Sequence, residues 1–185
     1  IVTRWNTLYA KYEAVFDGTN FFYVPYTKED AIGNAMQGMF SMEILFSPDG
    51  GVNPFSSMES GGLGYEMTSD NKLAFYYRAN NKWVLPNNNF QIPIQVGQNA
   101  YYHAVVTYNK TTFRMYLNGN KVKEMKVSGS FNFPQKNQAP DYLMGIGGDY
   151  RDVVIPSIQN SFIGKIVYAR LYKGVLSESD VKKMN

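Results

Sequence analysis

The sequence predicts an all-β protein, a two-sheet antiparallel jelly-roll sandwich that ends in a short C-terminal helical turn. Three observations predict this fold: apolar and polar residues alternate with period 2 in several short segments, turn-forming residues separate those segments, and helical periodicity is almost absent. Short strands at such spacing are typical of sandwiches and jelly rolls. With 185 residues, no internal repeat and no low-complexity linker, we expect one domain over residues 1–185.

Four segments in the first half of the chain show this alternation. They cover residues 14–16, 21–26, 40–46 and 73–78. Each is bounded by Gly, Asp, Asn or Pro residues, which favour turns. Within the last segment we expect Leu73, Phe75 and Tyr77 in the core, with Tyr76 and Arg78 on the opposite face.

The segment from Tyr101 to Lys121 predicts two strands and two turns. Its second strand places Phe113, Met115 and Leu117 on one face, which we expect in the core, and Arg114 and Tyr116 on the other. These five residues precede an Asn-Gly pair at 118–119, the strongest short hairpin signal, because both residues tolerate the positive φ of a type I′ turn.

The remaining segments are assigned from turn residues and from shorter patterns. Residues 92–96 contain Pro93, so they form an edge strand or a connector. Residues 143–146 and 164–172 supply the closing strands, whereas the Asn-, Gly- and Pro-rich stretches 79–89 and 131–142 are expected to be loops.

Two helices and one anchoring residue complete this assignment. Residues 28–36 are a helix candidate, and Ser177 is the expected N-cap of a terminal turn because Asp180 follows three residues later. Trp5 precedes the first clear strand, and we expect it to anchor the N-terminus.

Composition excludes several classes of function. Eighteen Lys and Arg against 15 Asp and Glu give a net charge of +3 with no basic run, so nucleic acid is not expected as a partner. The absence of cysteine excludes disulfides, thiol catalysis and Cys-based zinc sites. No apolar run is long enough to span a membrane. No signal peptide is visible, and the start at Ile1 suggests an excised piece of a larger protein.

Four blocks of residues resemble a known family in the family's own order. They are AVFDGTNFFYVPY (14–26), FSMEILFSPDG (40–50), YYHAVVTYNKTTFRMYLNGNKV (101–122) and the segment 146–180, which contains IGGDYR and SFIGKIVYARLYKGVLSESD. On these blocks the chain resembles laminin G-like domains of the concanavalin A-like lectin/glucanase superfamily, in the bacterial branch. The resemblance implies two packed antiparallel sheets, often with a concave face, and an extracellular or cell-envelope location.

The resemblance leaves the function open among several roles, because fold alone does not define function. We expect a non-catalytic module that binds a polysaccharide or another glycan. The alternative is a structural or accessory domain cut from a larger hydrolase or phosphoesterase, whose other domains would be its partners. A glycoside hydrolase is the less favoured third reading.

A glycosidase would need two carboxylates about 5 to 10 Å apart. No expected strand supplies such a pair, because Glu43 stands between Met42 and Ile44, and Glu59 and Glu66 lie in or near Gly-rich loops. The single histidine, His103, is expected to be a packed structural residue. We therefore expect no enzyme activity.

The resemblance also implies a calcium site where the first and last strands meet. At the positions where relatives commonly carry acids, this chain has Val167, Tyr168 and Asn20 instead. The acidic ligands of the site are therefore missing. Asp17 is then a turn residue whose carboxylate bonds nearby backbone amides. We expect no cofactor, with calcium as the one alternative.

Glycan recognition uses flat aromatic rings together with a few directed polar groups. Six residues fit this description: Trp83 in an expected loop, and five on strands that would line one concave surface if the polar faces of those strands shared a sheet. They are Glu43, Tyr76, Arg78, Trp83, Arg114 and Tyr116. The alternative explanation is ordinary pairing of Tyr with Arg across a solvent-exposed face.

Overall fold

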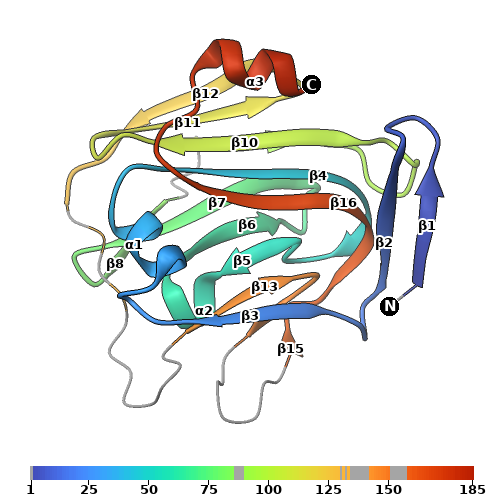
Figure 1. Cartoon of the computed structure of the whole chain (residues 1–185), viewed down its shortest axis with the longest axis horizontal. Coiled ribbons are helices and arrows are strands. Elements are labelled where there is room, and N and C mark those ends of the chain that lie inside the picture. The colour runs from blue at the N-terminus through green and yellow to red at the C-terminus, as the bar shows by residue number, and fades with distance from the viewer. Residues whose placement is uncertain (1, 86–89, 130, 132, 134–141, 151–157) are drawn as a thin grey trace.

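The computed structural model describes residues 2–85, 90–129, 131, 133, 142–150 and 158–185, and these residues form a sandwich of two antiparallel sheets (Figure 1). We call the sheet that contains the first and last strands sheet A and the other large sheet sheet B. The predicted two-sheet antiparallel fold with a C-terminal helical turn is therefore confirmed. In this described part of the chain, no helix is both long and apolar enough to cross a membrane.

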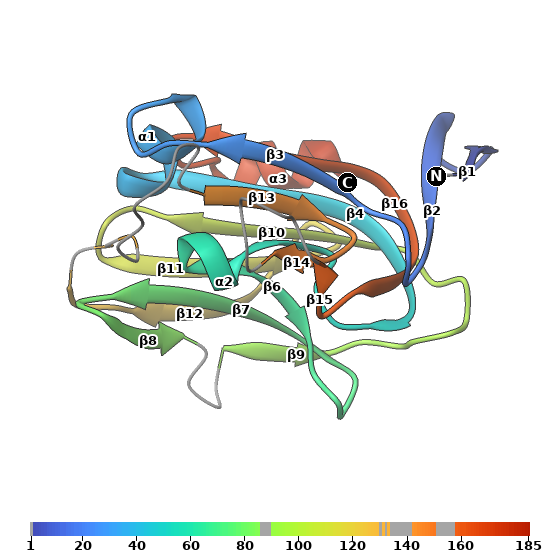
Figure 2. The same cartoon turned by 90° about the horizontal axis from the view of Figure 1, so that it is seen from below.

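Sheet A joins the two ends of the chain. Its order is β1 (Val2–Asn6), β2 (Lys11–Asp17), β16 (Phe162–Lys173), β4 (Phe40–Gly51), β10 (Tyr102–Tyr108), β11 (Thr112–Leu117) and β12 (Asn120–Lys126). The two longest strands, β4 and β16, lie side by side at its centre. Figures 1 and 2 both show the β1–β2 hairpin at one end of the molecule.

Sheet B covers the other side of the core. Its order is β3 (Phe22–Tyr26), β13 (Tyr142–Ile146), β5 (Phe55–Ser57), β6 (Leu63–Met67), β7 (Lys72–Ala79) and β8 (Lys82–Leu85), and β9 (Gln91–Pro93) also pairs with β7. A small ribbon of β14 (Asp149–Tyr150) and β15 (Ile158–Gln159) lies beside it. Strand β9 contains Pro93 and, among the described strands, pairs only with β7, so residues 92 and 93 form the edge strand that was one of the two alternatives for 92–96.

The core between the sheets is rich in aromatic rings. Phe40 and Phe113 of sheet A meet Tyr77 of sheet B, with ring centroids 6.5 and 4.6 Å away, and all three side chains are fully buried. Burial of each such ring contributes roughly 1.5–3 kcal/mol. The expected core residues Leu73, Phe75, Tyr77, Phe113 and Met115 are all buried, and Leu117 is half-buried against the same core, which confirms the faces assigned to both strands.

Two hairpins show how asparagine shapes this fold. Asn118 and Gly119 have φ values of 48° and 76°, as the type I′ turn predicted for them requires. Asn80 and Asn81 have φ values of 49° and 60° and join β7 to β8 in a second two-residue turn. The expectation of a loop over 79–89 was therefore wrong for 82–85, where β8 lies, and residues 86–89 lie outside the described residues.

The helices are short and are fixed by their caps. Helix α1 (Ala31–Gln37) begins after Asp30, whose carboxylate accepts hydrogen bonds from the amides of Ile32 and Gly33. Helix α3 (Glu178–Met184) has the capping box predicted at Ser177, with Asp180 as its acidic partner. A third helix, α2 (Met58–Gly61), was not predicted.

The N-terminal strand β1 was also missed by sequence reasoning. Trp5 lies on it, pairs with Tyr12 of β2, and is 53% exposed, so it does not anchor the N-terminus in the core. Of the second expected loop, 131–142, residues 132 and 134–141 lie outside the described residues, and Tyr142 begins β13.

Candidate functional site

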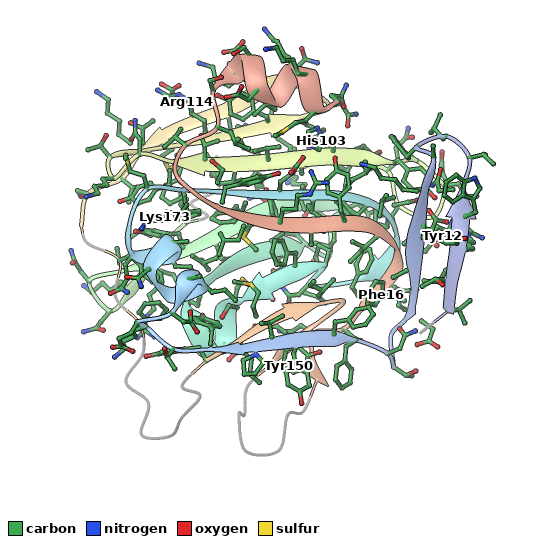
Figure 3. All side chains as sticks on the ribbon, viewed as in Figure 1. Tyr12, Phe16, His103, Arg114, Tyr150 and Lys173 are labelled. Carbon is green, nitrogen blue, oxygen red and sulfur yellow. The ribbon has the colours of Figure 1, made fainter. Side chains whose placement is uncertain are left out.

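The face of sheet A that points away from sheet B carries several buried polar groups. One of them, His103, is labelled among the side chains in Figure 3. We call this face the outer face of sheet A; helix α3 covers one side of it and the β1–β2 hairpin stands at its other end (Figure 1). Its polar and aromatic side chains come from β2, β4, β10 and β16. They are Glu13, Glu43, His103, Lys165, Tyr168, Arg170 and Tyr172.

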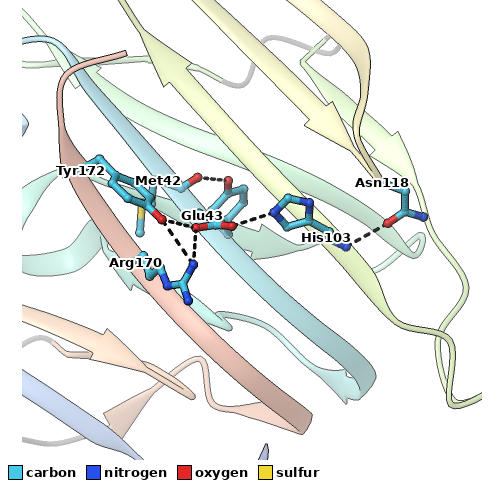
Figure 4. Close-up of polar contacts among 7 residues, drawn as sticks. Met42, Glu43, His103, Asn118, Arg170 and Tyr172 are labelled. Carbon is cyan, nitrogen blue, oxygen red and sulfur yellow. Dashed lines mark hydrogen bonds and ion pairs between the residues drawn. The ribbon is translucent and has the colours of Figure 1, made fainter. Parts of the chain in front are cut away.

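The carboxylate of Glu43 is the centre of the first cluster (Figure 4). Nε2 of His103 lies 2.8 Å from Oε1, while the Tyr172 hydroxyl donates to Oε2 at 2.6 Å and Arg170 Nη1 donates to it at 3.3 Å. Glu43 is fully buried and His103 is 3% exposed. The cluster therefore ties the three central strands β4, β10 and β16 together by their outer side chains.

Strand register explains why these side chains meet. Arg170 is the cross-strand partner of Glu43, and a β-bulge between Ile166 and Tyr168 changes the alternation of β16. Because of that bulge, Ile166 points into the core, whereas Tyr168 and Arg170 lie on the outer face. An extra residue in one strand thus creates the polar row.

The surroundings of Glu43 favour its ionised form. Burial alone would raise its pKa, but the hydrogen bonds from His103 and Tyr172 and the positive charge of Arg170 outweigh burial and lower the pKa to about 2. An ionised carboxylate only accepts hydrogen bonds, so Nε2 of His103 carries a proton that it donates to Glu43. This confirms His103 as a packed structural residue.

A second carboxylate, Glu13, is held in the same way at the hairpin. It accepts hydrogen bonds from Arg4 Nε, from Asn6 Nδ2 at 2.7 Å and from the Tyr101 hydroxyl at 2.5 Å, and it is 2% exposed. Burial would raise the pKa of Glu13, yet the bonds from Tyr101, Arg4 and Asn6 together lower it. Tyr101 belongs to the segment before β10, so Glu13 fixes the hairpin against the body of sheet A.

A pocket of about 370 Å³ opens beside Glu13, and we call it the hairpin pocket. Its lining comes from β1, the β1–β2 turn, β2 and the segment before β10. The lining residues are Arg4, Trp5, Asn6, Thr7, Leu8, Glu13, Asn99 and Tyr101. Arg4 and Glu13 pair on one face of the hairpin, while Trp5 pairs with Tyr12 on the other, at 5.2 Å between ring centroids.

A row of cations and rings continues from the pocket along the outer face. Tyr168 lies between the hairpin and the Glu43 cluster, with Lys11 Nζ 4.9 Å and the Arg170 guanidinium 4.1 Å from its ring centroid. Cations over an aromatic face are held by its quadrupole. The pocket lining, Tyr168 and Tyr172 thus place aromatic rings and cationic donors along the outer face of sheet A.

The five strand residues expected to line a single concave surface, and Trp83 with them, are divided between the two sheets. Glu43, Arg114 and Tyr116 lie on β4 and β11 of sheet A, whereas Tyr76 and Arg78 lie on β7 of sheet B, and Trp83 lies on β8 next to them. The condition that their polar faces share a sheet is not met, so the single surface does not form. Period 2 shows on which side of a strand a residue lies, but not to which sheet the strand belongs.

Two members of that set on sheet A have other partners. Tyr116 is 3% exposed and packs with Val105 under Val181 of helix α3. Arg114 donates to Glu124 of the neighbouring strand at 2.8 Å. These contacts give both side chains structural roles.

The three members on sheet B form a smaller cluster. The ring of Tyr76 stands perpendicular to that of Trp83, 5.7 Å away, and its hydroxyl donates to Glu66 at 3.1 Å. Trp83 is 49% exposed, and Arg78 is half-buried beside Gly62. This cluster lies on the opposite side of the sandwich from the hairpin pocket. Trp83 can therefore be compared with Trp5 of the pocket.

The acids of the outer face suit binding better than catalysis. A glycosidase acid needs a raised pKa, whereas Glu13 and Glu43 both have lowered pKa values and occupied oxygens. Burial raises the pKa of Asp149 to about 6, but its carboxylate accepts the amides of Met58 and Glu59 at the start of α2. That bonding makes Asp149 a helix cap.

The Asp17 turn has the role expected from sequence. The Asp17 carboxylate accepts hydrogen bonds from the amides of Thr19 and Asn20 at 2.8 and 3.2 Å. Within the ranges that the structure describes, no three His, Cys, Asp or Glu side chains gather as a metal site.

Sequence reasoning missed the hairpin pocket because its parts are distant along the chain. One local signal existed: the alternation of Arg4 and Asn6 with Trp5, followed by Tyr12 and Glu13, is a strand pattern on both sides of a turn. Nothing local connects that hairpin to Asn99 and Tyr101.

A family model described as the concanavalin A-like lectin/glucanases superfamily, of the laminin G type, matches residues 37–182. The chain therefore belongs to this superfamily, as the sequence blocks suggested. No curated protein matches the chain.

Solved structures share the fold at low sequence identity. The binding domain of botulinum neurotoxin DC in complex with SialylT is 16% identical, with a TM-score of 0.67 over 99% of this chain and 44% of that one. Domain 4 of AbnA, a GH43 extracellular arabinanase from Geobacillus stearothermophilus, in complex with arabinotriose, is 18% identical, with a TM-score of 0.64 over 100% and 80%. The chain thus spans less than half of the neurotoxin domain.

Proposed function

We propose that this domain is a non-catalytic carbohydrate-binding module and that it binds glycan at the hairpin pocket and along the adjoining outer face of sheet A. The observation that carries the proposal is the pocket itself, whose lining combines the exposed residue Trp5 and the phenol of Tyr101 with donors fixed by the buried carboxylate of Glu13. Sugars are recognised by this combination of apolar rings and directed polar groups.

The fixed geometry of the pocket supports binding in particular. Arg4, Asn6 and Tyr101 converge on Glu13, so their positions are set before a ligand arrives. Preorganised groups lose little conformational freedom on binding, which raises the affinity for a polar ligand. The AbnA domain, whose structure contains arabinotriose, shows that a domain of this fold occurs with an oligosaccharide.

The proposal includes the context in which such a module would work. We infer an extracellular or cell-envelope location in a bacterium and attachment to other domains of a larger protein. AbnA, a multidomain extracellular enzyme, supports this inference by analogy of fold only. The module would then capture a polysaccharide reversibly and perform no chemistry on it.

The test compares two tryptophans on opposite sides of the sandwich. Trp5 lines the hairpin pocket, and Trp83 lies on sheet B with a similar exposure, 53% against 49%. The intact domain is first screened against neutral and acidic polysaccharides, and affinities of Trp5→Ala and Trp83→Ala for the best ligand are measured by calorimetry. We expect Trp5→Ala to weaken binding roughly 10- to 30-fold and Trp83→Ala less than about 2-fold.

Three results would contradict this proposal. Loss of binding in Trp83→Ala alone would move the site to sheet B. Hydrolysis of the bound glycan by the wild-type domain would make it an enzyme. Absence of binding to every glycan would favour the structural or accessory role.

A further inference from the structure

Lys165 is a buried cation that forms no ion pair with any of the described residues. It lies on the outer face of sheet A, between Val15 of β2 and Ser47 of β4, and it is 7% exposed. Its Nζ donates to the side-chain oxygen of Asn99, and among the described residues no carboxylate lies within 4.0 Å of it. A buried ammonium is costly unless an opposite charge is nearby.

The two buried glutamates of the outer face do not supply that charge. The oxygens of Glu13 are occupied by Arg4, Asn6 and Tyr101, and those of Glu43 are occupied by His103, Arg170 and Tyr172. Each acid already has an arginine as its counter-ion. Lys165 is therefore positive charge in excess of what the surrounding side chains neutralise.

Asn99 connects this charge to the hairpin pocket. Its side chain accepts the Lys165 hydrogen bond, and Asn99 also lines the pocket, as Arg4 does. Arg4 uses Nε for Glu13, and its 53% exposed guanidinium offers further N–H donors to the pocket. An anion that takes the place of the Asn99 oxygen as the acceptor of the Lys165 Nζ hydrogen bond would bind Lys165 and Arg4 together.

The surface beside the pocket has the same sign. Among the six side chains Arg4, Lys11, Lys165, Arg170, Glu13 and Glu43, four carry a positive charge and two a negative charge, which leaves an excess of two within this group. Rings stand next to these cations, Trp5 at the pocket and Tyr168 beyond it. A ligand that fits both features has an apolar ring face and a carboxylate.

We propose that the hairpin pocket binds an acidic sugar, a uronic or sialic acid residue, whose carboxylate is held by Lys165 and Arg4. This inference rests on the proposed glycan-binding function and adds the chemical class of the ligand. Hydrogen bonds between charged partners are short and strong, so the carboxylate dominates selection among sugars.

The first experiment changes the ligand and leaves the protein intact. Trigalacturonate and 3′-sialyllactose are titrated into the domain by calorimetry, each beside its carboxyl-reduced, neutral counterpart. We expect at least one acid to bind roughly 10-fold or more tightly than its reduced form, and to weaken several-fold between about 50 and 500 mM NaCl. The two acids distinguish a uronic from a sialic source.

The second experiment removes the positive charge of Lys165 and keeps the apolar part of its side chain. Lys165→Met retains the apolar packing of the chain, and Lys126→Met, on exposed edge strand β12 of the same sheet, is the control with the same change in net charge. We expect roughly a 10-fold loss of affinity for the acidic sugar in Lys165→Met and less than a 2-fold loss in Lys126→Met.

Two outcomes would overturn the inference, and they are distinguishable. Equal affinity for acidic and reduced sugars, with Trp5→Ala still impaired, would reject the acidic ligand while the glycan-binding function stands. No binding of any sugar would reject both. If Lys165→Met does not fold, the comparison of acidic with reduced ligands on the wild-type domain still decides.

Discussion

The two sides of the sandwich treat buried acids in opposite ways. On the outer face of sheet A, Glu13 and Glu43 each have an arginine and a tyrosine hydroxyl as partners, and their pKa values are lowered. On the sheet B side, burial raises the pKa values of Glu66 and Asp149, and no cation pairs with either among the described residues. Sheet A thus holds fixed, compensated charge, a rigid polar surface suited to a ligand, whereas sheet B holds acids that ionise at a cost.

The largest expected effect of this difference is on the pH dependence of stability. The free energy of unfolding should fall on both sides of an optimum. Because the folded-state pKa of Glu43 is about 2 against an ordinary 4.5, its stabilisation is present above pH 4.5 and is lost as the pH falls toward 2. That loss amounts to about 3 kcal/mol. The pKa of Asp149 is raised to about 6 from 3.8, so its contribution is present below pH 3.8 and is lost as the pH rises through 6.

Urea denaturation between pH 2 and pH 8 measures this profile. We expect the free energy of unfolding to be highest near pH 4, where the Glu43 contribution is nearly complete and the Asp149 contribution is not yet lost, with Glu43→Gln removing most of the fall on the acid side. Asp149→Asn should flatten the fall between pH 4 and 6 instead. A profile that Glu43→Gln leaves unchanged would contradict the account of the Glu43 cluster.

A smaller effect is expected from two matched hydroxyl deletions. Tyr172→Phe and Tyr76→Phe each remove one hydroxyl that donates to a glutamate, on opposite sides of the sandwich. Loss of a donor to the fully buried, ionised Glu43 should cost about 2 kcal/mol, and loss of the one to half-buried Glu66 about 0.5 kcal/mol. Chemical denaturation at pH 7 compares them, and equal costs would mean that the two faces do not differ.

Local patterns were sufficient to predict much of the fold. Phe113 and Met115 in the core, the Asn118 turn and the Ser177 cap all depend on neighbours within a few residues, and period 2 or capping chemistry encodes them. Strand β8 was missed because an Asn-Asn pair was interpreted as a loop, although Asn80 and Asn81 adopt the positive φ of a tight turn.

The candidate site could not be predicted from local patterns. Glu13 meets Tyr101 across 88 positions of sequence, and Lys165 meets Asn99 across 66. Such contacts depend on which strands become neighbours, and a one-residue bulge at Ile166 decides which side chains of β16 face outward. The expected grouping of Glu43 with Tyr76 failed for the same reason, because the pattern contains no information on sheet membership.

The location of the glycan site is the central claim, and the two tryptophan indoles test it directly. The chain has only Trp5 and Trp83, so its ¹⁵N–¹H spectrum contains two indole signals, one from β1 of sheet A and one from β8 of sheet B. Titration with the best-binding glycan should shift the Trp5 signal and leave the Trp83 signal in place. A shift of the Trp83 signal alone would place the site on sheet B and contradict the account.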